Sequence, residues 1–221
     1  MGGREGQERY RRPRKLHKRL IVVCEGRKTE YFYFSSLRTL LVQAELAALK
    51  VLSGRGSNPI DVVQHAIRHR DADVAEGIFE EGDRVYALID VDPHDRSKEQ
   101  PLDTALQIAR NSGIQVLLSN PSFEVWILCH VLSAAEMKRS FVDPDAVNSE
   151  LKKRLGFGKT ELNANHRLFE PLVKRAKDAV AVAREVRTKH FRNCADLRKA
   201  NACTEVYRLV EYLLGESDAP P

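Results

Sequence analysis

The chain has 221 residues, of which 43% are hydrophobic and 30% are charged, with a formal net charge of +5. This composition fits a soluble globular protein, and the length is enough for one sizeable core. No apolar run approaches the roughly 20 residues that a membrane-spanning helix needs, and the basic N-terminus lacks the apolar segment of a secretory signal. We therefore expect no membrane partner and a cytoplasmic location, with Cys24 and Cys129 as buried thiols inside apolar runs.

The charge is distributed unevenly along the chain. Residues 1–19 hold eight Lys and Arg against two acidic residues, residues 20–149 hold 13 against 19, and residues 150–200 hold 14 against six. An acidic half flanked by two basic regions favours a polyanionic partner, although a solubilising tail and an ordinary solvated helix face would give the same counts.

The N-terminal half alternates between apolar runs and helical patterns. Residues 1–18 show no apolar periodicity, and "RLIVVCEG" (19–26) then predicts a strand buried on both faces and stopped by a glycine. Thr29 is suited to cap a helix through residue 46, and "ALKVLSGRG" (48–56) predicts a second strand. A helix is predicted from Pro59 to residue 70.

The same alternation continues toward the middle of the chain. "RVYALID" (84–90) predicts the third strand, and "PLDTALQIARNSG" (101–113) predicts an amphipathic helix closed by a glycine. "IQVLLS" (114–119) predicts the fourth strand, and "NPSFEVWILCHVL" (120–132) predicts a helix capped by Asn120. From residue 144 the patterns are helical only, including a run opened by Pro171.

Alternating strands and helices predict an α/β fold with a Rossmann-like parallel sheet of about four strands. With right-handed crossovers the natural strand order is 2-1-3-4, which places a ligand-binding crevice between strands 1 and 3. We expect a basic flexible arm over residues 1–18, an α/β core over 19–143, a helical C-terminal region over 144–215 packed on that core, and a tail over 216–221.

Three carboxylates follow strands that flank this crevice. Glu25 ends the first strand, and Asp90 and Asp92 end the third, two residues apart so that both point the same way. Aspartate is also a common turn residue, so an isolated D-x-D is explained by turn chemistry alone. Like charges this close repel unless a cation or a shared proton lies between them, and carboxylate oxygens suit Mg²⁺ or Mn²⁺.

Other residues could extend such a site. Lys28 would bring a positive charge near a bound phosphate, and Glu25 could serve as general acid or base instead of metal ligand. Glu124 near the start of its predicted helix would be stabilised by the helix dipole, yet it also follows the fourth strand and could be a further ligand. The cations that we expect to contact nucleic-acid phosphates are Arg11, Arg12, Arg14, Lys15, Lys159, Lys174, Lys177 and Arg184.

Several segments resemble known families. "VVCEGRKTE" (22–30) with "ALIDVDPHD" (87–95) resembles the Toprim signature, a Glu-Gly after the first strand and a D-x-D after a later one. More narrowly, "CEGRKTEYFYF", "SNPSFEVWILCH" and "NACTEVYRLVEYLL" together resemble the RloB-like proteins of bacterial anti-phage and restriction-linked loci, in order over residues 20–214. The resemblance implies a Toprim-like metal-dependent nuclease of antiviral defence, of the abortive-infection kind, often encoded beside an AAA-type ATPase. It also implies that Glu25, Asp90 and Asp92 form the acidic metal centre.

Three functions remain open on this basis. The first is a Mg²⁺-dependent nuclease acting on DNA or RNA. The second is a non-catalytic nucleic-acid or nucleotide-binding module with a vestigial metal site, acting with an ATPase partner. The third is a phosphoacceptor switch, which is disfavoured because receiver domains carry their acidic pair after strand 1. A homo-oligomer is compatible with each of them.

Overall fold

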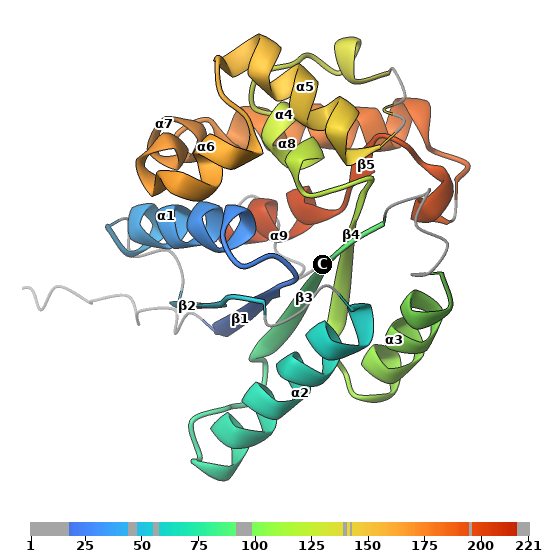
Figure 1. Ribbon diagram of the computed structural model, residues 1–221. Coiled ribbons are helices and arrows are strands. Elements are labelled where there is room, and N and C mark those ends of the chain that lie inside the picture. The colour runs from blue at the N-terminus through green and yellow to red at the C-terminus, as the bar shows by residue number, and fades with distance from the viewer. Residues whose placement is uncertain are drawn as a thin grey trace, which may run out of the picture.

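A five-stranded sheet with helices on both faces forms the centre of the computed structural model (Figure 1). The structure describes residues 18–43, 48–54, 58–91, 99–138, 141, 143–194 and 196–215. The strands are β1 (Arg19–Cys24), β2 (Ala48–Leu52), β3 (Arg84–Asp90), β4 (Gln115–Asn120) and β5 (Cys203–Thr204). Their order is β2-β1-β3-β4-β5, with the first four parallel and β5 antiparallel to β4. The predicted α/β fold and its 2-1-3-4 order are confirmed.

The helices lie in two layers. One face of the sheet is covered by α2 (Pro59–Ala75) and α3 (Glu99–Asn111), and the other by α1 (Thr29–Gln43) and the C-terminal helices (Figure 1). The remaining helical segments are α4 (Glu124–Leu128), η2 (Glu136–Lys138), α5 (Pro144–Leu155), α6 (Lys159–Ala164), η3 (His166–Phe169), α7 (Glu170–Val173), α8 (Ala176–Glu185), η4 (Val186–His190), η5 (Leu197–Lys199) and α9 (Val206–Leu213). Within the described ranges, no helix is both long and apolar enough to cross a membrane.

This layering explains why β1 is apolar at successive positions. Alternate side chains of a strand point to opposite faces of its sheet. Leu20 and Val22 pack into the core beneath α1, whereas Ile21 and Val23 pack into the core beneath α2 and α3. Both faces are therefore buried, and the carboxyl end of β1 is fixed between two hydrophobic layers.

The C-terminal region adds a strand that the sequence patterns did not predict. Cys203 and Thr204 pair with Asn120 and Ser119 of β4, and the Thr204 and Ser119 hydroxyl oxygens lie 2.7 Å apart. A two-residue strand is too short to show a periodic signal. The pairing joins the C-terminal region directly to the sheet edge.

The helix expected over residues 120–132 is shorter than predicted, and Asn120 does not cap it. Its Nδ2 instead donates to the carbonyl oxygens of Leu197 and Arg198, each at 2.9 Å. Helix α4 begins at Glu124, after Phe123, and has no side-chain cap. The capping interpretation failed because the acceptors of Asn120 lie 77 and 78 residues away, beyond any local pattern.

His130 illustrates how tightly this side of the core is packed. Its Nδ1 lies 2.9 Å from the Trp126 carbonyl oxygen and its Nε2 lies 3.2 Å from the Tyr33 hydroxyl. Burial lowers the pKa of His130 to about 4, although its backbone partners at Trp126 and Ile127 raise it. It is a core histidine.

We expect the His130 ring to remain neutral in the folded protein until the pH falls to about 4. The unfolded chain binds a proton near pH 6.5, so this site costs stability as the pH falls from 6.5 to 4, by up to about 3 kcal/mol. Arg175 and Asp178 are the charged groups that act on the ring, in opposite directions. NMR titration of the ring signals measures the midpoint directly. A midpoint near 6.5 in the folded protein would contradict the prediction.

Candidate active site

Two glycines shape the turn that follows β1. Gly54, just after β2, donates its N–H to the Gly26 carbonyl oxygen at 3.1 Å. A Cβ atom on Gly54 would lie 1.8 Å from the Glu25 carbonyl oxygen. The close approach of these two backbone segments requires glycine at position 54, and it fixes the backbone of Glu25.

Glu30 in the first turn of α1 folds back onto the same turn. Its Oε1 accepts the Gly26 N–H at 2.8 Å, and a Cβ on Gly26 would lie 2.1 Å from Glu30 Oε2. Gly26 therefore does more than stop a strand, because its lack of a side chain makes room for a second buried carboxylate. Only 6% of the Glu30 surface is exposed.

Glu25 reaches across to the neighbouring strand. Its Oε2 accepts the backbone N–H of Asp90 at 2.8 Å, so the side chain spans from the end of β1 to the end of β3. Asp90 is the last residue of β3, where it pairs in register with Ser119 of β4. The two carboxylates therefore meet at the carboxyl edge of the central strands, as the strand order predicts.

Glu124 supplies a fourth carboxylate, and Lys159 supplies a cation. Glu124 is only 2% exposed, and its Oε1 lies 2.9 Å from Lys159 Nζ. Lys159 is the first residue of α6, where its backbone N–H donates to Asn148 Oδ1 at 2.7 Å. A Cβ on Gly158 would lie 2.4 Å from the same oxygen, so the loop before α6 is closely packed and places the lysine over the carboxylates.

The carboxylates repel one another strongly. Burial, together with the charge of Glu124, raises the pKa of Glu30 to about 7. Burial, followed by the charges of Glu30, Glu25 and Glu124, raises the pKa of Asp90 well above its usual range. Burial alone would lower the pKa of Lys159, but Glu124, Asp90 and Glu30 together raise it. The site is thus short of positive charge even with Lys159 in place.

The donor set matches a hard divalent cation in its chemistry. Four buried or partly buried carboxylates offer oxygen ligands, which Mg²⁺ and Mn²⁺ prefer, and a cation would relieve the repulsion that helps to raise the pKa values of Glu30 and Asp90. Among the described residues, however, no three His, Cys, Asp or Glu side chains are grouped closely enough to hold a metal ion. Asp92 lies outside the described residues, and Glu124 is engaged by Lys159. A full ligand set therefore needs Asp92 or a shift of side chains.

The other predicted site residues are dispersed. Lys28 is exposed in the turn after β1. Lys174 lines a groove beside α1, Lys177 lies on the exposed face of α8, and Arg184 forms an ion pair with Glu211 of α9. The arm cations Arg11, Arg12, Arg14 and Lys15 lie outside the described residues.

Glu30 is the residue that sequence reasoning missed. It stands five positions after Glu25, at the start of the helix, where an acidic residue is readily explained by the helix dipole. Its burial could not be read from the sequence. The available signal was Gly26, since a glycine four residues before a first-turn glutamate leaves room for the side chain to fold back.

The fold and the site define an α/β protein with an acidic cluster at the carboxyl ends of its central parallel strands. The model of the family described as RloB-like protein matches residues 20–213. The chain therefore belongs to the RloB-like family. No curated protein and no solved structure matches it.

Proposed function

We propose that the protein is a Mg²⁺- or Mn²⁺-dependent nuclease of Toprim-like type that hydrolyses phosphodiester bonds of DNA or RNA in cytoplasmic antiviral or restriction-linked defence. The observation that carries the proposal is the convergence of four carboxylates, Glu25, Glu30, Asp90 and Glu124, at the carboxyl ends of β1 and β3, where Glu25, Glu30 and Glu124 are buried. The raised pKa values of Glu30 and Asp90 mean that their charged forms reduce the stability of the folded protein. Clusters with such perturbed pKa values are typical of functional sites.

In this proposal Glu25, Asp90 and Asp92 hold the metal, and Glu124 joins them when Lys159 moves away. A bound divalent ion supplies Lewis-acid stabilisation of the charge that develops on a phosphate oxygen. Glu25 holds the end of β1 next to the end of β3, because its side chain accepts a hydrogen bond from the Asp90 backbone N–H. Lys159 and the exposed Lys28 are the cations of the site that would orient a phosphate.

Lys159 also gives a reason to retain a second candidate. Its ammonium group already partly neutralises Glu124, and the described residues contain no ready three-ligand cluster. A binding module that works with an AAA-type ATPase and has lost catalysis would have these features. Nucleic-acid binding without cleavage at any metal concentration would favour this candidate.

The test is incubation of the purified protein with mixed cellular DNA and RNA in Mg²⁺, in Mn²⁺ or in EDTA. The proposal expects cleavage of at least one class of nucleic acid in either metal and none in EDTA. Cleavage that persists in EDTA would contradict a metal-dependent mechanism. A parallel incubation with an AAA-type ATPase and ATP tests whether the partner is required.

Replacing Glu25 with Gln is expected to weaken divalent-ion binding and to reduce cleavage by roughly a hundredfold, with only slight rescue by excess Mn²⁺. A pure metal ligand would be rescued largely by added Mn²⁺, whereas a general acid or base would not be, because Gln cannot transfer the proton. Cleavage rates over a range of Mn²⁺ concentrations separate these roles. Normal metal binding and normal cleavage would show that the crevice between β1 and β3 is not the active site.

A further inference from the structure

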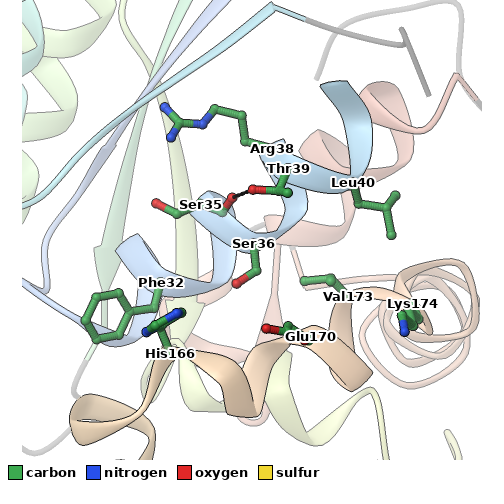
Figure 2. A pocket seen from close by; sticks show the side chains of 10 residues that line it. All are labelled: Phe32, Ser35, Ser36, Arg38, Thr39, Leu40, His166, Glu170, Val173 and Lys174. Atoms are coloured by element: carbon green, nitrogen blue, oxygen red, sulfur yellow. Dashed lines mark hydrogen bonds between the residues drawn. The ribbon is translucent and has the colours of Figure 1, made fainter. Parts of the chain in front are cut away.

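A groove of about 510 Å³ lies beside α1, and its lining does not include Glu25, Glu30, Asp90 or Glu124 (Figure 2). One wall is the face of α1 that carries Phe32, Ser36 and Leu40, and the other is formed by η3 and α7. The full lining is Phe32, Ser35, Ser36, Arg38, Thr39, Leu40, His166, Glu170, Val173 and Lys174. Its volume falls in the range of pockets that hold small organic ligands, about 300 to 1,000 Å³.

Two helical segments connect the groove with the carboxylate cluster. Glu30 of the cluster and Phe32 of the groove belong to the first turn of α1, and Lys159 begins the α6 segment that leads directly into η3 and α7. The Thr29 hydroxyl donates to Asn163 Oδ1 at 2.8 Å, which fixes the start of α1 against the end of α6. The groove is therefore held in a fixed position relative to the carboxylates.

The lining has different chemistry at its two ends. Figure 2 shows Phe32 and His166 together at one end, with ring centroids 6.1 Å apart, and Lys174 at the other. Arg38 lies at the margin of the lining and points away from Glu170 and Lys174, so Lys174 is the cation that faces the α1 wall (Figure 2). Within the described part of the chain Lys174 forms no ion pair. Between the ends, Ser36 projects from α1 toward Glu170 of α7. Aromatic surface, hydroxyl groups and an unpaired cation in one groove match the bases, sugars and phosphates of an unpaired nucleic-acid strand.

We propose that this groove binds a single-stranded segment of the nucleic-acid substrate outside the cleavage site, an inference that rests on the proposed function. A base packs against Phe32 and His166, while Lys174 contacts a backbone phosphate. A duplex cannot present an unstacked base to Phe32, so the groove selects substrates with unpaired nucleotides next to the cleaved bond.

Glu170 gives the groove a preference among bases. A carboxylate repels phosphates but accepts a hydrogen bond from an exocyclic amino group, as carboxylates do with cytosine N4. Because Glu170 lies between the aromatic end and Lys174, it faces the base rather than the phosphate in this arrangement. Adenine, cytosine and guanine, which carry exocyclic amino groups, are therefore preferred over thymine or uracil.

The test measures binding of labelled single strands of about ten nucleotides, oligo-dA, oligo-dC or oligo-dT, by fluorescence anisotropy in EDTA. Phe32→Leu should weaken binding about tenfold, since it removes the stacking surface but keeps an apolar side chain. Lys174→Gln should weaken binding severalfold and lower the salt slope by about one. Glu170→Gln should reduce the preference for oligo-dA and oligo-dC over oligo-dT. Lys153→Gln, an equal charge change at an exposed position of α5, is the matched control.

Because the measurement is made without metal, it separates this inference from the proposed nuclease activity. Normal binding by both Phe32→Leu and Lys174→Gln, relative to Lys153→Gln, overturns the inference even if the wild-type protein cleaves nucleic acid. Lost binding in those variants supports it even if no cleavage is found. Equal affinity of the wild-type protein for a duplex of the same sequence would also overturn it. The same holds if the variants bind the oligonucleotides normally and lose only the binding of an ATPase partner. Lys174 is exposed, so its variant is not at risk of misfolding.

Discussion

Replacing Asp90 with Asn is expected to reduce metal-dependent cleavage by at least about a hundredfold while the folded protein becomes no less stable. Asn has nearly the same volume but no negative charge, so it removes a ligand charge and also relieves repulsion. In the folded protein Asp90 has a raised pKa because of burial and the charges of Glu30, Glu25 and Glu124. An ionised Asp90 therefore opposes folding at neutral pH, and its neutralisation should raise the free energy of unfolding.

Urea unfolding and the cleavage assay, both at neutral pH, check the two parts of this prediction. Asp178→Asn is a suitable control, because Asp178 is an exposed residue of α8 outside the cluster. It should change neither quantity much. A marked loss of stability in Asp90→Asn without metal would instead assign Asp90 a structural role in the turn after β3.

Gly54→Ala is expected to destabilise the protein by about 3 kcal/mol or more, and to reduce any activity of the site. The new Cβ would lie 1.8 Å from the Glu25 carbonyl oxygen and 2.8 Å from that of Cys24. Both are backbone atoms, so no side-chain rotation relieves the contact, and the β1 turn must move away from β2. That movement also displaces the Glu25 carboxylate from the Asp90 amide.

Gly77→Ala provides the control for this substitution. Gly77 has a φ of 67° but nothing within 4 Å of its Cβ position, so the cost there is the left-handed backbone alone, about 1 to 2 kcal/mol. The free energy of unfolding from urea titration gives both values. Equal losses in the two variants would show that the contact between Gly54 and Glu25 is not rigid.

The sheet was predictable because its signal is local. The central strands β1 and β3 are short apolar runs, β1 followed by Glu25 and Gly26 and β3 ended by Asp90, and both faces of each are buried. The order followed from crossover handedness, and the order placed Glu25 beside Asp90. These parts of the site needed no knowledge of long-range side-chain contacts.

The rest of the site depends on contacts between distant segments. Lys159, at the start of α6, meets Glu124 from 35 residues later in the chain, and Asn120 binds carbonyl groups 77 and 78 residues away. The pairing of β5 with β4 joins residues about as far apart. Arg184 was predicted to contact phosphate because it lies on a basic helix face, but α9 supplies Glu211 as its partner. Helical periodicity identifies such a face without showing which of its cations form ion pairs.

Calorimetric titration of Mg²⁺ and Mn²⁺ into the wild-type protein and Asp90→Asn shows whether the carboxylates at the ends of β1 and β3 form a divalent-metal site. Calorimetry measures this binding without requiring the correct nucleic-acid substrate. We predict saturable binding to the wild-type protein and at least about tenfold weaker binding to Asp90→Asn. Equal affinity in the two proteins, or no binding to the wild type at millimolar metal, would contradict the presence of this metal site.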